Sequence, residues 1–272
     1  MINSTPYFQV RHNCLIYYEL PNITYTTPIQ NFTTKAYSGK VTDSVKKRIN
    51  KAVDLLIQKS PKVYVYNPIT KKNQPFTLNF ITLTVSSIRL ISSIEGYVNL
   101  LKPFLRKLRV RFKTGISYIW KCELQERGQI HYHLTCNKFV HLDWIRSEWN
   151  RLQYKNRYLD HYAKVYKSFN PNSTDVHAVW KVNDIASYLS KYLSKVDKTQ
   201  ALKSKVWDAS KDLKIKRFSF IPSDSFQIKI NDLVKVGKIE MINLDQCLIF
   251  KTKNVKALLE RHHLIDLKNY LL

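Results

Sequence analysis

The sequence is poor in the residues that mark several common protein classes. It has five glycines among 272 residues and no GxxxxGK[ST] phosphate-binding motif, so an ATP-driven helicase domain is not expected within it. Its four cysteines lie far apart and form no CxxC pair. A zinc ribbon and a disulfide framework are therefore not expected, and a reducing compartment fits the chain. The cysteines are Cys14, Cys122, Cys136 and Cys247.

Long apolar segments are also missing. No run reaches the roughly 18 apolar residues that a transmembrane helix needs, so no membrane span is expected. Residues 1–6, Met-Ile-Asn-Ser-Thr-Pro, contain neither a basic segment nor an apolar one, and no secretory signal is expected there. We therefore expect a cytoplasmic protein.

Acidic residues are scarce relative to basic ones. The chain has 20 Asp and Glu against 45 Lys and Arg, a formal net charge of +25. So large a charge repels itself in a folded chain and is best tolerated next to a polyanion. Nucleic acid is the first partner to consider and an anionic membrane the second; a merely solvated basic surface is the alternative. The hydrophobic fraction of 44% is that of a globular protein.

The hydrophobic pattern predicts alternating strands and helices. At least one strand pair is a tight hairpin, which favours an α+β fold with an antiparallel sheet over a parallel one. We expect residues 61–200 to form the core, residues 1–60 an N-terminal extension with one amphipathic helix, and residues 201–272 a C-terminal extension with short strands and a terminal helix. The expected strands are residues 62–66, 76–85, 116–124, 129–135, 176–182, 218–220, 226–230 and 238–242, and the expected helices are residues 41–59, 91–112, 144–152, 185–195 and 254–272.

Residues 116–135 are predicted to form a hairpin with two histidines on its second strand. His131 and His133 are two residues apart, so on a strand their side chains project from the same face. If the loop is residues 126–128, with Gly128 in the left-handed conformation that favours a bulge, Glu123 lies directly across from His131. A two-residue loop would turn Glu123 to the opposite face, so this expectation depends on the turn.

Two imidazoles and a carboxylate on one face can chelate a divalent cation. A nitrogen- and oxygen-rich site with open positions suits Mn²⁺ or Mg²⁺ when the task is to polarise a phosphate oxygen. The alternative is a pair of structural histidines, because His-x-His is by itself a weak signal. The remaining histidines are isolated in the sequence or unable to share a face, and we expect them to be structural.

A second segment, residues 184–195, is predicted to be a helix that carries two tyrosines. Tyr188 and Tyr192 lie four residues apart along one flank, with Lys191 and Lys195 beside them. A tyrosine hydroxyl has a pKa near ~10, so as a nucleophile it needs positive charge nearby and a polarised phosphate. Aromatic residues at this spacing also commonly belong to a core, which is the alternative. The apolar seam of the helix is Ile185, Leu189, Leu193 and Val196.

In this order, three segments resemble the motifs of HUH-class rolling-circle replication initiators: Phe80-Ile-Thr-Leu-Thr84, His131-Tyr-His133 and Tyr188-Leu-Ser-Lys-Tyr192. The doubled Tyr-x-x-Lys is similar to the two-tyrosine initiators of small single-stranded DNA phages (microvirus-like) and related plasmids. The pattern Trp-x-x-Glu-x-x-x-Arg-Gly-x-x-His-x-His, from Trp120 to His133, matches the same group. The resemblance covers roughly residues 76–195. It implies a central antiparallel sheet of about five strands flanked by helices, with RRM-like or ferredoxin-like topology.

The resemblance also implies an activity, the metal-dependent nicking and rejoining of single-stranded DNA at a replication origin. His131, His133 and Glu123 would be the ligands of Mn²⁺ or Mg²⁺. Arg127 and Lys121, on the same hairpin, are expected to contact DNA. A host helicase and polymerase would be the protein partners, in the cytoplasm of the host cell if the replicon is viral.

The tyrosine helix would supply the catalytic groups. The resemblance implies that Tyr188 and Tyr192 are candidate nucleophiles, and that Lys191 and Lys195 hold the scissile phosphate or neutralise developing charge. The product would be a 5′-phosphotyrosine and a free 3′-OH that primes synthesis, and the retained phosphodiester energy would let the strand be rejoined without a nucleotide cofactor.

Three rival interpretations remain open. A relaxase or a transposase of the same endonuclease class would share the chemistry, although relaxases usually place the tyrosine before the histidines. A non-catalytic protein could bind single-stranded nucleic acid by stacking bases on Tyr and Trp of a basic sheet. A basic structural protein of a small virus would leave the histidine hairpin and the tyrosine helix unexplained.

Overall fold

The chain is an α+β protein with antiparallel sheets, as the sequence predicted. It divides into two compact units, residues 35–214 and a unit that combines residues 1–34 with residues 215–272. This division differs from the three consecutive segments expected, because the two ends of the chain share one sheet. The computed structural model describes residues 4–22, 42–60, 63–67, 70–87, 89–113, 115–125, 127–178, 189–191, 193, 205–253 and 255–261.

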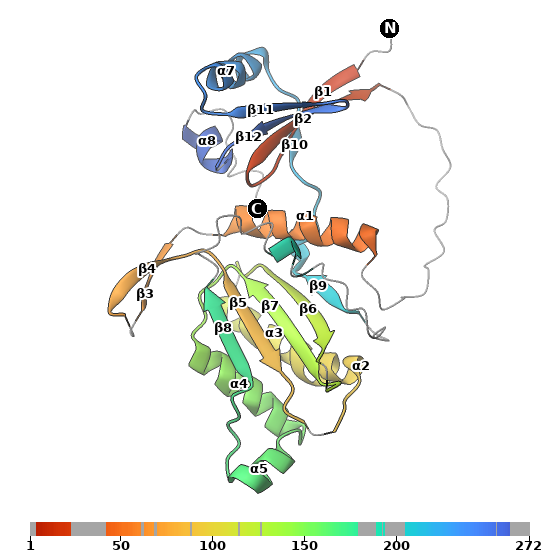
Figure 1. Cartoon of the computed structure of the whole chain (residues 1–272), viewed down its shortest axis with the longest axis vertical. Helices are drawn as coiled ribbons and strands as arrows, with labels where there is room; N and C mark the ends of the chain where they lie inside the picture. The colour runs from red at the N-terminus through yellow and green to blue at the C-terminus, as the bar shows by residue number, and fades with distance from the viewer. Residues whose placement is uncertain are drawn as a thin grey trace. The chain divides into compact units, whose positions relative to one another are not determined.

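The larger unit contains a five-stranded antiparallel sheet in the order β8-β5-β7-β6-β9 (Figure 1). Its first four strands in the chain and the helices between them follow the β-α-β-β-α-β order of a ferredoxin-like fold. The strands are β5 (Asn79–Thr84), β6 (Tyr118–Leu124), β7 (Ile130–Cys136), β8 (Thr174–Ala178) and β9 (Trp207–Ala209), and β3 (Val63–Asn67) pairs with β4 (Lys72–Phe76) in a separate hairpin.

Helices cover one face of this sheet (Figure 1). Strand residues alternate between the two faces, and those on the covered face are apolar: Leu83, Trp120 and Tyr132 belong to one buried cluster with the inner faces of α3 and α4. The helices of the larger unit are α1 (Asp43–Lys59), α2 (Ser93–Gly96), the π-helical turn η1 (Tyr97–Leu101), α3 (Lys102–Phe112), α4 (Leu142–Lys155), α5 (Asp160–Tyr166) and the 3-10 turn η2 (Lys211–Leu213).

A second cluster lies on the opposite face of the sheet. Thr42 caps α1, and the apolar residues of this helix recur at helical spacing. They are buried in one cluster with Phe80 of β5, Ile119 of β6, and Leu189 and Leu193. The helix expected at residues 41–59 is therefore confirmed, and it belongs to the larger unit rather than to an N-terminal extension.

The smaller unit has its own five-stranded antiparallel sheet, in the order β10-β1-β2-β12-β11, and its own core. Residues 226–230, expected to be a strand, lie instead in a helix, because Ser223 caps it and Phe226, Ile230 and Leu233 share one buried face. The elements are β1 (Ser4–Val10), β2 (Cys14–Pro21), β10 (Ser219–Phe220), α7 (Asp224–Lys235), β11 (Glu240–Leu244), β12 (Cys247–Lys251) and α8 (Val255–Arg261).

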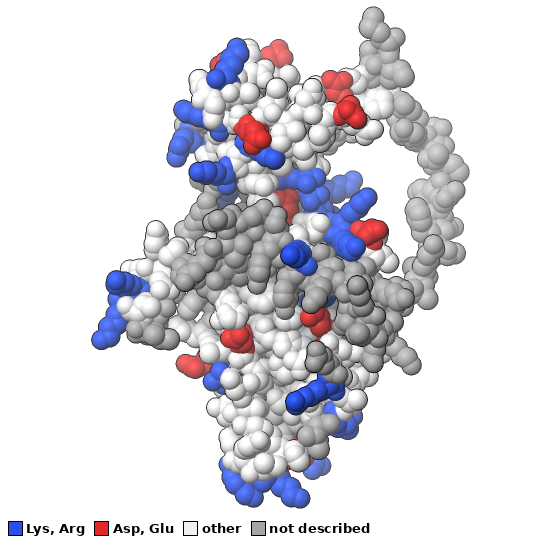
Figure 2. Space-filling model, viewed as in Figure 1, with Lys and Arg blue, Asp and Glu red and all other residues white. Residues whose placement is uncertain are grey.

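The surface carries the positive charge that the composition requires. On the face shown in Figure 2, Lys and Arg side chains are spread over both units and outnumber the acidic side chains. In the part of the chain that the structure describes, no helix has the length and apolar character needed to cross a membrane.

Candidate active site

The hairpin of β6 and β7 has the register that the turn predicted. Glu123 lies opposite His131, and Leu124 lies opposite Ile130. The loop closes with hydrogen bonds from the Gln125 amide to the Gln129 carbonyl at 2.8 Å and from the Gly128 amide to the Gln125 carbonyl at 2.7 Å. Gly128 has a φ of +77°, so a residue with a side chain would be strained there. This turn therefore keeps Glu123 and the two histidines on one face.

Two rows of polar residues cross this face. Strand pairing places Thr84, His131 and Glu123 side by side in the first row. It places Thr82, His133 and Lys121 side by side in the second row. The rows lie on the same face as Phe80, whose ring stacks on His133 with a centroid distance of 5.6 Å. We call these six polar residues the histidine cluster.

Hydrogen-bond partners orient both imidazoles by their Nδ1 atoms. The Nδ1 atom of His131 lies 3.1 Å from the Thr84 hydroxyl and 2.8 Å from the Gln125 side-chain amide. The Nδ1 atom of His133 lies 3.4 Å from the Thr82 hydroxyl. Burial, followed by the repulsion of His133, lowers the pKa of His131 to about 4. His131 is therefore neutral at pH 7, which is the state of imidazole that binds metal.

Glu123 lies between a histidine and a lysine. Its Oε2 atom is 3.3 Å from Nε2 of His133, and its Oε1 atom accepts a short hydrogen bond from the ammonium of Lys121. Burial opposes ionisation of this carboxyl, but the hydrogen bonds from His133 and Lys121 outweigh it and lower the pKa of Glu123 to about 2. Glu123 is thus ionised at neutral pH.

The donor set of the histidine cluster fits a divalent cation. A neutral imidazole and an ionised carboxylate are ligand-competent forms, and hydrogen bonds at Nδ1 leave Nε2 as the ring nitrogen for a metal. As the side chains lie, however, no three His, Cys, Asp or Glu residues in the described ranges are arranged to hold a metal ion. The contact between Glu123 and Lys121 is one feature of the cluster that would have to change.

Buried polar residues of α4 fix the end of β5 next to the cluster. The Trp149 indole donates to the carbonyl of Thr84 at 2.8 Å, and the Ser86 amide donates to Gln153 Oε1 at 2.7 Å. Asn150 accepts from the Ser173 hydroxyl at 2.6 Å, just before β8 begins. The helix on the covered face therefore holds the strand ends that carry the polar rows.

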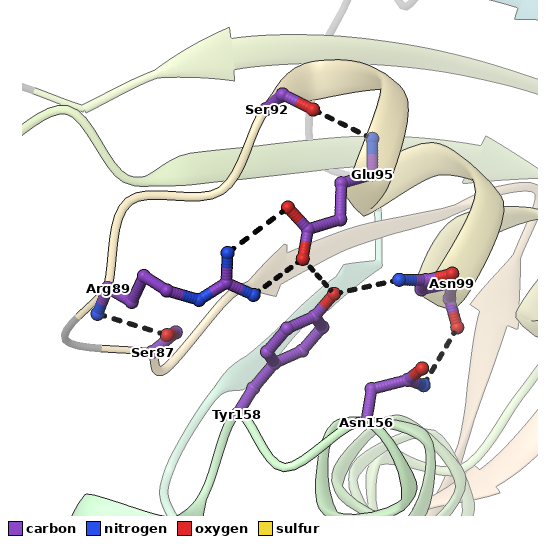
Figure 3. A network of polar contacts seen from close by, with 7 residues as sticks. All are labelled: Ser87, Arg89, Ser92, Glu95, Asn99, Asn156 and Tyr158. Atoms are coloured by element: carbon purple, nitrogen blue, oxygen red, sulfur yellow. Dashed lines mark hydrogen bonds and ion pairs between the residues drawn. The ribbon is translucent and has the colours of Figure 1, made fainter.

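A second polar network ties the segment after β5 to the helices (Figure 3). The carboxylate of Glu95 accepts hydrogen bonds from Arg89 at 2.6 Å and from the Tyr158 hydroxyl at 2.9 Å. Ser92 caps α2, and Asn99 donates to the Tyr158 hydroxyl at 3.0 Å. The network anchors the segment that follows Thr84.

The predicted tyrosine helix is described only in part. Residues 189–191 and 193 are helical; Tyr188, Tyr192 and Lys195 lie outside the described residues. Leu189 and Leu193 are buried, and Lys191 is exposed. Since the two leucines share a cluster with Phe80 and Ile119, this helical segment packs on the same face of the sheet as the histidine cluster.

The two predicted DNA contacts lie in different environments. Arg127 is exposed at the hairpin tip. Lys121 has a side chain only 3% exposed and pairs with Glu123, so the structure places it inside the histidine cluster rather than on the surface. The sequence analysis assigned no role to Thr82 or Thr84, although the alternating apolar and polar residues of Phe80-Ile-Thr-Leu-Thr84 would have placed both on the histidine face.

The fold and the cluster together define a ferredoxin-like α+β unit with two histidines, a carboxylate and a lysine on one sheet face. Residues 79–197 match the model of the replication-associated protein ORF2 family, a family of rolling-circle replication initiators. The matched segment runs from the start of β5 through the partly described tyrosine helix, so it contains the whole histidine cluster. Neither the curated proteins nor the solved structures contain a match to the chain.

Proposed function

We propose that the chain initiates rolling-circle replication by nicking single-stranded DNA at a replication origin, with a tyrosine as nucleophile, and later rejoins the strand. The observation that carries the proposal is the shared sheet face: the histidine cluster and the helical segment at Leu189 and Leu193 lie on the same side of the sheet. The family match over residues 79–197 and the net charge of +25 support it.

The proposed reaction is a transesterification. The hydroxyl of Tyr188 or Tyr192 loses its proton, and its oxygen forms a bond to the phosphorus of the scissile phosphodiester. The bond from phosphorus to the 3′ oxygen breaks, and that oxygen leaves with the electron pair and takes up a proton. The products are a 5′-phosphotyrosine and a free 3′-OH. Attack of a 3′-OH on the phosphotyrosine reverses the step and rejoins the strand.

We propose that His131, His133 and Glu123 hold Mn²⁺ or Mg²⁺. When bound, such a cation supplies Lewis-acid polarisation of the phosphate oxygens. The chain's own residues prepare the site, because Thr82, Thr84 and Gln125 fix the ring orientation of the histidines.

The basic side chains have a separate part in the proposal. Exposed Arg127 at the hairpin tip would contact the DNA backbone, and exposed Lys191 with Lys195 would hold the scissile phosphate. The free 3′-OH is a primer for a host polymerase. Strand separation is assigned to a host helicase, and ATP hydrolysis by the purified chain would contradict that assignment.

The test uses labelled single-stranded DNA that carries the origin of the chain's own replicon. The full chain is incubated with this DNA in Mn²⁺ or in EDTA, and the products are separated on a denaturing gel. Wild type is compared with Tyr188→Phe, Tyr192→Phe and the double variant. We expect a protein-linked DNA band that needs Mn²⁺ and is absent from the double variant. DNA binding without any linked band would favour the non-catalytic binding protein.

A further inference from the structure

Lys121 is a buried charge in the middle of the histidine cluster. Lysine is rarely buried without a partner, because taking an ammonium out of water is costly. Only 3% of its side chain is exposed, and its ammonium pairs with Glu123. Strand register puts Lys121 directly opposite His133. A positive charge is therefore fixed beside the side chains that the proposed function assigns to a cation.

The contacts of Glu123 show what this charge does. Lys121 approaches Oε1 of Glu123, and His133 approaches Oε2. Both carboxylate oxygens thus already face a donor within the cluster. A divalent ion that binds Glu123 has to share or replace the contact with Lys121.

We infer that Lys121 is a built-in counter-cation of the histidine cluster: its ammonium holds Glu123 when no divalent ion is bound, competes with that ion for the carboxylate, and so sets the metal affinity of the site. The inference rests on the proposed function, because it takes Glu123, His131 and His133 to be the ligands. Lys121 is a positioning residue in this account, since it acts through Glu123.

The competition has an electrostatic consequence. The negative charge of Glu123 and the positive charge of Lys121 offset each other in the buried cluster, which lowers the cost of burying either. When a divalent ion joins, the cluster gains a net positive charge that faces an incoming DNA phosphate. Lys121 would therefore weaken metal binding by the free protein and leave a more cationic site for DNA.

The experiment measures Mn²⁺ binding to the full chain by isothermal titration calorimetry, without DNA and without an activity readout. Two variants remove the charge: Lys121→Met, and Lys121→Gln, which keeps a hydrogen-bond donor for Glu123. Lys107→Met is the matched control, because Lys107 is an exposed residue of α3 on the other side of the sheet. Glu123→Gln tests the ligand itself.

We expect both Lys121 variants to bind Mn²⁺ about tenfold more tightly than wild type, because a nearby positive charge is gone. Lys107→Met should bind like wild type. Without Lys121, the Glu123 carboxylate is buried without this partner, so Mn²⁺ should also raise the melting temperature of Lys121→Met more than that of wild type.

The outcomes separate this inference from the proposed function. If Glu123→Gln weakens Mn²⁺ binding but the Lys121 variants bind no more tightly than wild type, the counter-cation role is wrong and the metal site stands. If no variant and no wild-type protein binds Mn²⁺, the metal site and the counter-cation role both fail. Tight binding by the Lys121 variants alone would support the competition directly.

Discussion

The two faces of the five-stranded sheet have opposite properties, although the same strands form both. On β5, Leu83 is buried among the aromatic residues of α4, while Thr84 beside it contacts His131. On β7, Tyr132 is fully buried between Trp120 and Trp149, while His131 and His133 face the other way. Alternation along a strand thus lets one face supply rigid packing and the other supply chemistry.

The comparison explains how a polar cluster can be held in place. The histidines lie on strands whose backs are packed by large apolar side chains, and rigid support of this kind is what a reactive site requires. Substitutions on the histidine face should therefore change binding and reaction. Substitutions on the covered face should change stability.

The largest effect is expected from removing an imidazole. His131→Ala or His133→Ala should lower the rate of DNA-linked product formation by about 100-fold or more, because the proposed cation loses a ligand. Binding of single-stranded DNA, which depends on the basic surface, should change little. Quantitative denaturing gels and a binding titration measure the two quantities separately.

His161→Ala is the matched control for these variants, since His161 lies exposed on α5. It should behave like wild type in both assays. Equal losses in all three variants would mean that the histidine cluster has no special part in the reaction.

Neighbouring residues of β5 offer the sharpest contrast between the faces. Thr84→Val removes the hydroxyl next to His131 and should weaken Mn²⁺ binding about tenfold with little loss of stability. Leu83→Ala should lower the free energy of unfolding by about 2–5 kcal/mol and leave the Mn²⁺ affinity of the folded protein unchanged. Calorimetric titration and chemical denaturation test both variants, and the reverse assignment of effects would contradict the account.

A close contact on the covered face gives a smaller effect. A Cβ atom at Gly96 would lie 2.7 Å from the Tyr132 hydroxyl and 3.1 Å from Cδ1 of Ile130. Gly96→Ala should therefore lower the free energy of unfolding by about 1–3 kcal/mol, despite the better helix propensity of alanine. Combining it with Tyr132→Phe, which removes the hydroxyl, should cost less than the sum of the two single variants. Strict additivity in denaturation curves would exclude the contact as the cause.

The smallest effect concerns Glu95 in the polar network of Figure 3. The hydrogen bond from Arg89 lowers the pKa of this carboxyl below its usual range. A lowered folded-state pKa means that the ionised carboxylate contributes stability above the unfolded pKa of ~4.3, and that this contribution is lost as the pH falls through the folded value. Glu95→Gln should thus be less stable than wild type by about 0.5–1 kcal/mol at pH 7. The gap should close in acid, and a gap that widens between pH 5 and pH 3 would contradict this.

Local sequence signals predicted the hairpin of the site because its geometry is local. The spacing of His131 and His133 and the glycine at position 128 fix the face and the turn, and these determine the register of Glu123. The helix at residues 41–59 was equally clear, because its apolar residues repeat at helical spacing and are buried on one side.

Features that depend on distant contacts were not predictable in this way. The sheet that joins β1 and β2 to β12 brings together the two ends of the chain, and no local pattern encodes that pairing. The burial of Lys121 depends on packing around the cluster, so sequence alone indicated a surface contact with DNA. Residues 226–230 have strand-like composition, and the prediction failed because the Ser223 cap and the recurrence at Leu233 were overlooked.

The most direct test of the central claim is to locate the attached nucleotide. The full chain is reacted with its origin DNA in Mn²⁺, the product is digested with protease and nuclease, and the nucleotide-bearing peptide is sequenced by mass spectrometry. The account predicts a 5′-phosphate linked to Tyr188 or Tyr192. Linkage to any other residue, or an origin cleaved without a linked peptide, would contradict it.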